Sequence, residues 1–169
     1  MAYEFYVTVK FDKQGDNKGE SIKEAHKKKI PGLSYHHSIQ APRDVATGRP
    51  SGARQHGPIT FTKEWGPSSP LFASALCQNE NLSSVLFEFM QTNKMGESEI
   101  YHTIKLTNAT VSKIEYRTGG GMTGGQSSAK TEAAYDTMEL EEISMTYQKI
   151  EVENLPGKTM FTDDWATTQ

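Results

Sequence analysis

The chain has 169 residues, of which 35% are hydrophobic and 23% charged, and its 18 basic and 21 acidic side chains give a formal net charge of -3. This length suits one domain around a single core, so residues 1–169 are interpreted as one domain. The charge balance excludes a basic field that would attract nucleic acid or an anionic membrane. Since Cys77 is the only cysteine, an intrachain disulfide and a Cys-x-x-Cys metal or redox site are also excluded.

The N-terminal segment alternates between apolar and polar residues from Tyr3 to Phe11, which predicts a strand with one buried face. This charged segment lacks the apolar stretch of a cleavable signal peptide. No run in the chain approaches the roughly 18 apolar residues that a membrane helix needs. We therefore expect a protein that is made in the cytoplasm, does not insert into membranes, and leaves the cell, if it does, without a cleavable signal.

A long polar loop is predicted at 40–58, between extended segments that resume at about residue 30 and at Ile59. Its sequence, QAPRDVATGRPSGARQHGP, holds three prolines, three glycines and three arginines. Loops of this length are uncommon inside a compact domain and are usually either functional or disordered. The loop resembles a phosphate-binding loop only faintly, because no Gly-Lys-Ser/Thr follows.

One short helix is predicted in the stretch SSPLFASALCQ, at 68–78. Ser69 is the expected N-cap and Pro70 suits the first helical position. Phe72 and Ala75 form part of a short apolar stripe, so a helix of two to three turns is expected. Cys77 near its end is interpreted as a small packing residue and not as a nucleophile.

The segments after this helix predict strands. Apolar residues alternate over 84–91, 100–106, 111–116 and 135–152. In the last segment the alternation changes phase, and a β-bulge near Glu141 and Glu142 would restore one buried face. These two glutamates and Glu139 are expected on the exposed face. Many short strands with one helix predict a mainly β protein, built as an antiparallel barrel or sandwich.

The glycine-rich stretch RTGGGMTGGQS contains the pattern G-x-G-x-x-G at Gly119, Gly121 and Gly124, which can mark a dinucleotide site. Such a site needs a following helix whose N-terminus receives the phosphate, and no helical stripe follows here. We interpret the stretch as a mobile link between two strands, weakly ordered over about 118–130. A nucleotide-binding enzyme is retained as an alternative hypothesis.

The sequence predicts no catalytic residue, no metal ligand and no cofactor. His36 and His37 are adjacent, so in a strand they point to opposite faces. His102 lies on an apolar strand face, where a hydrogen-bonded core histidine is expected. A catalytic triad is not indicated by any of these residues.

The order of several motifs resembles that of the haemolysin-coregulated protein (Hcp) family, the tube subunits of bacterial type VI secretion systems. The matching segments are GES…HKKKI (19–30), DVATGRPSGAR (44–54), ITFTKEWGPSSPLFASAL (59–76), IYHTIKLTNATVSKIE (100–115), the glycine-rich stretch, YQKIEVEN (147–154) and DDW (163–165). No single motif is diagnostic, but their order covers nearly the whole chain.

The resemblance implies a phage tail-tube-like antiparallel β-barrel with one short flanking α-helix and a long extended loop. It implies a structural subunit without catalysis, which forms homohexameric rings that stack into a hollow tube. The implied partners are other copies of the chain, the contractile sheath, the spike tip protein and small effectors carried in the lumen. The alternative within this fold is an effector-binding adaptor barrel that does not polymerise.

The resemblance also implies that the extended loop reaches from one ring towards the next. The family's loop positions fall on Asp44, Thr47, Gly48, Arg49, Ser51, Gly52 and Arg54. The chain has Gly66 and Pro67 where many relatives carry polar or acidic residues, so the entry to the helix is expected to differ. No toxin domain is expected after Trp165.

Overall fold

The structure is a computed structural model and describes residues 4–118 and 139–165. The strands are β1 (Phe5–Phe11), β2 (Gly15–Asp16), β3 (Ile30–Gly32), β4 (Ser34–His36), β5 (Ile39–Gln40), β6 (Gln55–His56), β7 (Ile59–Glu64), β8 (Leu82–Thr92), β9 (Ser98–Arg117), β10 (Leu140–Asn154) and β11 (Thr159–Asp164). A 3-10 turn covers Glu24–His26, and the α-helix of the described residues is α1 (Ser69–Cys77).

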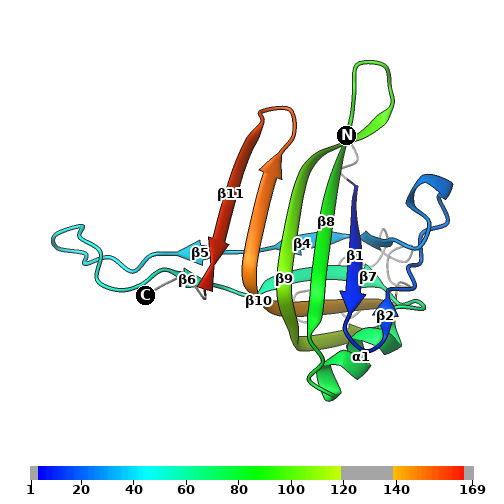
Figure 1. The fold of residues 1–169 in the computed structure, drawn as a ribbon, viewed down its shortest axis with the longest axis horizontal. Coiled ribbons are helices and arrows are strands. Elements are labelled where there is room, and N and C mark those ends of the chain that lie inside the picture. The colour runs from blue at the N-terminus through cyan, green and yellow to red at the C-terminus, as the bar shows by residue number, and fades with distance from the viewer. Residues whose placement is uncertain (1–3, 119–138, 166–169) are drawn as a thin grey trace, which may run out of the picture.

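Nine strands form one antiparallel sheet in the order β2-β1-β8-β9-β10-β7-β4, with β11 added to β10 and β3 added to β1 (Figure 1). The segment 30–36 links the two sides of this sheet, because β3 pairs with β1 whereas β4 pairs with β7. The mainly β fold with one short helix is thus confirmed. The strands curl round a core, although their hydrogen-bonded ladder is not closed into a complete barrel.

A sharp bend crosses the three central strands of the sheet. The buried residues change phase at the same level on each: from Leu82 to Val85 on β8, from Leu106 to Ala109 on β9 and from Tyr147 to Ile150 on β10. Asn108, at this level, has a left-handed φ of 51°. The long strands therefore turn a corner there, as Figure 1 shows, and both halves direct apolar side chains inward.

The bulge predicted near Glu141 and Glu142 is wrong. β10 keeps an even register with β7 from Leu140 to Met145, and its irregularity with β9 lies between Ser144 and Met145. The extra residue there belongs to β9. The prediction failed because Glu141 is fully buried and faces inward in the same series as Ile143 and Met145. Since Glu141 is charged, a search for alternating apolar residues did not count it as part of the buried face.

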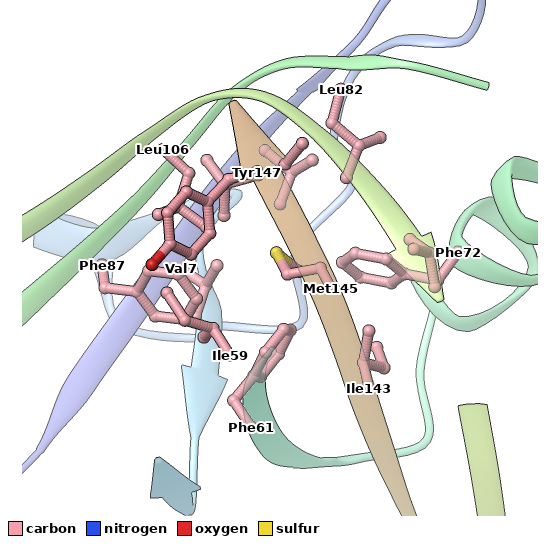
Figure 2. Close-up of a cluster of buried hydrophobic side chains, with 14 of the residues drawn as sticks. Val7, Ile59, Phe61, Phe72, Leu82, Phe87, Leu106, Ile143, Met145 and Tyr147 are labelled. Carbon is pink, nitrogen blue, oxygen red and sulfur yellow. The ribbon is translucent and has the colours of Figure 1, made fainter. Parts of the chain in front are cut away.

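The core fills the space between the curled sheet and α1 (Figure 2). Phe72 of α1 is fully buried, and its ring lies 6.0 Å from that of Phe61 on β7, edge to face. Met145 of β10 lies beside both rings in Figure 2. Full burial of a side chain such as Phe72 contributes about 1.5–3 kcal/mol, so this face holds the helix on the sheet.

The helix begins one residue earlier than predicted, because Ser68 and not Ser69 is the N-cap. Pro70, predicted at the first helical position, is therefore at the second, still within the first turn. The Ser68 N–H donates to Glu20 Oε1 at 2.9 Å, so a distant carboxylate occupies the helix N-terminus. A Cβ on Gly66 would lie 2.0 Å from Glu20 Cγ, which explains why glycine stands at this entry.

Cys77 is exposed, so its interpretation as a packing residue is wrong. It lies at the last position of α1, where the stripe defined by Phe72 and Ala75 has turned away. A nine-residue helix offers few inward positions, and the sequence alone does not show on which side its end falls.

A buried ion pair joins β7 to β10. Lys63 Nζ lies 2.7 Å from Glu141 Oε1, and both side chains are fully buried. Lys63 Nζ also donates to the Glu64 carbonyl oxygen at 2.7 Å and lies 3.3 Å from Glu20 Oε1. Ser69 Oγ donates to Glu141 Oε1 at 2.7 Å. The expected exposure of Glu141 is therefore wrong, whereas Glu139 is exposed as predicted.

Candidate functional site

The loop predicted at 40–58 is a hairpin arm that projects from one end of the molecule (Figure 1). We define the arm as residues 39–56. β5 pairs with β6 at its base through Ile39 and His56, and an isolated bridge joins Arg43 to Pro50 nearer the tip. The arm is thus ordered by its own backbone hydrogen bonds, even though it lies outside the core.

The tip of the arm is a tight turn organised by Asp44. The Asp44 N–H donates to the Arg49 carbonyl oxygen at 2.9 Å, and the Gly48 N–H donates to the Asp44 carbonyl oxygen at 2.8 Å. Asp44 Oδ1 accepts the Ala46 N–H at 2.8 Å, and this hydrogen bond lowers the pKa of the Asp44 carboxyl. Gly48 has φ +68°, a left-handed conformation that favours glycine. Val45 is held fully exposed by this turn.

The structure places the seven residues predicted for the inter-ring loop at three positions along the arm, although all are exposed. Asp44, Thr47, Gly48 and Arg49 lie together at the tip, and Ser51 and Gly52 follow on the returning side. Arg54 lies next to β6 and is engaged at the base of the arm.

The base of the arm is fastened to β11 by a bidentate ion pair. Arg54 Nε and Nη2 donate to Asp163 Oδ2 and Oδ1 at 2.5 and 2.6 Å. His56 Nε2 lies 2.6 Å from Asp163 Oδ2. Hydrogen bonds from Arg54, and secondarily from His56, lower the pKa of the Asp163 carboxyl to about 2. Asp163 is therefore ionised at neutral pH.

Two histidines and a tyrosine continue this contact into the sheet. Tyr147 OH lies 2.6 Å from His56 Nδ1 and 2.9 Å from His37 Nε2. Burial raises the pKa of Tyr147 and lowers the pKa of His37, so both are neutral at pH 7. The Trp165 ring packs 5.1 Å from that of His56. We call Arg54, Asp163, His56, Tyr147 and His37 the arm-base network.

The hydrogen bonds of this network run in one direction when His56 is neutral. His56 Nε2–H donates to Asp163, so its Nδ1 accepts the Tyr147 hydroxyl proton. The Tyr147 oxygen then accepts from His37 Nε2–H. Each donor has an acceptor, and the arm strands are thereby fixed to β10 and β11.

Sequence reasoning found the arm but missed most of the arm-base network. His37 lies 110 residues from Tyr147 along the chain and His56 lies 107 residues from Asp163, so only the packing of the arm base on the paired strands β10 and β11 brings them together. Tyr147 continues the apolar alternation of its strand, so its pattern indicated a core residue. The only sequence signal for these residues was that their side chains end in polar groups and lie in or next to strands. This signal is weak.

His102, expected as a hydrogen-bonded core histidine, is half-buried, and its ring packs edge to face on Phe89. His36 is exposed whereas His37 is half-buried, as their adjacent positions predict. Within residues 4–118 and 139–165, no cluster of three His, Cys, Asp or Glu side chains could hold a metal ion. In the same residues no helix is long and apolar enough to span a membrane.

The glycine pattern at Gly119, Gly121 and Gly124 lies outside the described residues, as does most of the link predicted at 118–130. The described ends of this segment are antiparallel neighbours, because Arg117 at the end of β9 pairs with Leu140 at the start of β10. The stretch therefore connects two adjacent strands, as predicted. Its order stays a prediction.

Comparison with protein families decides the assignment. The model of the family described as "Type VI secretion system effector, Hcp" matches residues 8–153. The chain belongs to the Hcp family. An Hcp-family chain is a type VI secretion tube protein of a ring-forming family, so the resemblance stated from the motif order is confirmed.

Individual relatives of this Hcp-family chain agree. It is 29% identical to the "Major exported protein" of Pseudomonas aeruginosa, with 98% of this chain and 96% of that protein covered. A crystal structure of an Hcp protein superimposes with a TM-score of 0.83 at 29% identity, covering 97% of this chain and all of the other. Hcp1 from E. coli EAEC 042, as a double mutant, gives a TM-score of 0.80 at 26% identity, covering 97% and 99%.

Proposed function

We propose that this Hcp-family chain forms six-membered rings that stack into a hollow tube, and that the arm makes the contact between rings. The observation that carries the proposal is the arm itself. Its tip is ordered by backbone hydrogen bonds, its base is fixed by the arm-base network, and its seven family positions are exposed. Holding a projecting segment in one conformation costs conformational entropy, which a receiving surface on another copy offsets.

The proposed role is structural and involves no catalysis. The subunit is exported from the cell in which it is made, which agrees with the name of the Pseudomonas aeruginosa relative, "Major exported protein". The proposed partners beyond further copies are the contractile sheath, the spike tip protein and small effectors carried in the lumen.

Imaging of the purified protein tests the proposal. Negative-stain electron microscopy should show six-membered rings, and native mass spectrometry should give the mass of six chains. The rings should stack as concentration rises. A chain that stays monomeric at high micromolar concentration would contradict the tube role and favour the non-polymerising adaptor.

A further inference from the structure

An apolar groove lies beside α1, at a surface that the arm of the same chain does not reach. The groove encloses about 420 Å³ and is lined by Trp65, Gly66, Ser69, Pro70, Ala73 and Tyr116. The Trp65 and Tyr116 rings pack edge to face with their centroids 6.1 Å apart, and both are substantially exposed. The open space lies beside this ring pair, along Ser69, Pro70 and Ala73 of α1.

The wall of the groove is fixed before any partner arrives. The Trp65 N–H donates to the Glu139 carbonyl oxygen at 3.0 Å, and the Trp65 indole N–H donates to the Leu140 carbonyl oxygen at 2.9 Å. A preorganised apolar surface binds with a smaller ordering cost than a mobile one. The groove is therefore suited to receive one small aliphatic group.

The arm presents such a group. Val45 has a relative exposure of 102%, although the hydrogen bonds of Asp44 hold the turn around it in place. Arg43 and Arg49 lie on either side of it and are exposed. The tip is thus an aliphatic side chain near two arginines and one carboxylate, Asp44, which is engaged by the Ala46 N–H, so its net charge is positive.

Two exposed glutamates lie beside the groove, while the neighbouring Arg117 is paired with Glu142. Glu64 directly precedes Trp65 in the chain, and Glu139 accepts its backbone hydrogen bond. Both glutamates are exposed. The tip and the groove are therefore complementary in polarity and in charge.

The two surfaces lie at opposite ends of the molecule. In Figure 1 the arm projects from one end of the long axis, whereas α1 lies towards the other. Contact between them requires a second copy in a head-to-tail arrangement, which is heterologous and can repeat along a stack.

We propose that Val45 of one copy occupies the groove beside the Trp65–Tyr116 ring pair of a copy in the next ring, with Arg49 facing Glu64. This inference rests on the proposed stacking of rings and adds to it the surface that receives the arm. The occupant is another copy of this chain.

Cysteine cross-linking tests the contact. In a Cys77→Ser background, Val45→Cys and Ala73→Cys are combined in one chain, and assembled rings are oxidised. Because the contact lies between rings, covalent ladders longer than six chains are expected. The control combines Met95→Cys with Ala73→Cys, since Met95 is also highly exposed on a projecting turn, and it should give no ladder above background.

Charge reversal tests the same contact without cysteines. Arg49→Glu alone and Glu64→Arg alone should each reduce the length of stacks, and the double variant should restore it. Each chain supplies both an arm and a groove, so the double variant restores opposite charges at every interface. Restored stack length in the double variant would support the assigned pair. If the two substitutions acted at unrelated sites, their effects on stack length would add instead.

The outcomes separate this inference from the proposed function. Stacked rings without ladders, or equal ladders in the control, would overturn the groove assignment and leave the tube role standing. The first result is also expected if residues 119–138 of the same chain fill the groove. Rings that never stack, or a chain that stays monomeric, would overturn both.

Discussion

At the scale of single residues, charged side chains fasten the arm and the helix to the sheet. Asp163 receives two hydrogen bonds from Arg54 and contacts His56, while the fully buried Lys63 pairs with Glu141. In both cases one residue comes from the part of the chain before α1 and its partner comes from β10 or β11. Single substitutions there should therefore loosen contacts between elements distant in sequence.

Asp163→Asn should destabilise the base of the arm, because the neutral amide loses the charged hydrogen bonds from Arg54. Removing a hydrogen bond to a charged group costs about 1.5–3 kcal/mol, and partial solvent exposure of Arg54 favours the lower end. The measurement is amide hydrogen exchange of the arm at neutral pH. Asp12→Asn, a surface change outside the network, is the control and should leave the arm unchanged.

The same contact predicts a pH dependence. The pKa of Asp163 is depressed to about 2, so its stabilising effect is complete above the ordinary pKa of an aspartate and is lost as pH falls towards 2. The free energy difference between wild type and Asp163→Asn should be constant from pH 7 to about 5 and shrink from about pH 4 to 2. Urea unfolding at each pH measures it, and a pH-independent difference would contradict the assigned ion pair.

Lys63→Met should cost about 3–5 kcal/mol in the free energy of unfolding, because it leaves the Glu141 carboxylate buried without its cation. Lys63→Met combined with Glu141→Leu should recover much of this loss, since both charges are then gone. Urea unfolding of the two variants checks the sign. An equal loss in the double variant would show that packing and not charge is responsible.

At the scale of elements, the arm is a hairpin whose turn is ordered by hydrogen bonds, and it is not an irregular loop. Its strand pairing, its tip turn and its base contacts each involve a different set of residues. Changes at the tip and at the base should therefore have distinguishable effects.

Gly48→Ala should loosen the tip, because φ +68° disfavours any side chain while nothing crowds the added methyl group. A cost of roughly 1 kcal/mol corresponds to about fivefold faster exchange of the Asp44 and Gly48 amides. Gly52→Ala is the matched control, since it has no positive φ and its nearest contact would be 3.6 Å from Pro42. Equal exchange in both variants would contradict the turn geometry.

Arg54→Glu and Arg49→Glu should both weaken ring stacking while sparing the ring, but by different routes. Glu at 54 faces Asp163 and repels it, so the base of the arm should loosen and its amides exchange faster. Glu at 49 changes only the exposed tip, so amide exchange at the base should stay as in wild type. Electron microscopy measures stack length, which both variants should shorten. Amide hydrogen exchange at the base of the arm distinguishes the variants, because only Arg54→Glu should accelerate it.

At the scale of the whole molecule, the sheet turns a corner and wraps one core, and the arm extends away from it (Figure 1). This arrangement leaves the arm clear of the core, as the proposed contact between rings requires. It also provides no helix after β9 in the described residues that could receive a dinucleotide phosphate.

Titration with NAD or ATP should accordingly leave thermal stability unchanged. A ligand at about 100 times its dissociation constant would stabilise the fold by roughly 2.7 kcal/mol, a shift that thermal unfolding detects easily. A concentration-dependent rise in the melting temperature would reopen the nucleotide hypothesis for the glycine-rich stretch.

Local patterns in the amino-acid sequence were enough to predict the strands with clear alternation, the short helix, the position of the arm and, through the order of motifs, the family. These features depend on local periodicity, turn chemistry and motif spacing, which a linear chain displays directly. The tertiary structure alone decided that Glu141 is buried, that Cys77 is exposed, and that Arg54 serves the base of the arm and not its tip. The physical reason is that the burial and pairing of charged groups depend on partners brought from about 80 to 110 residues away, which no local pattern records.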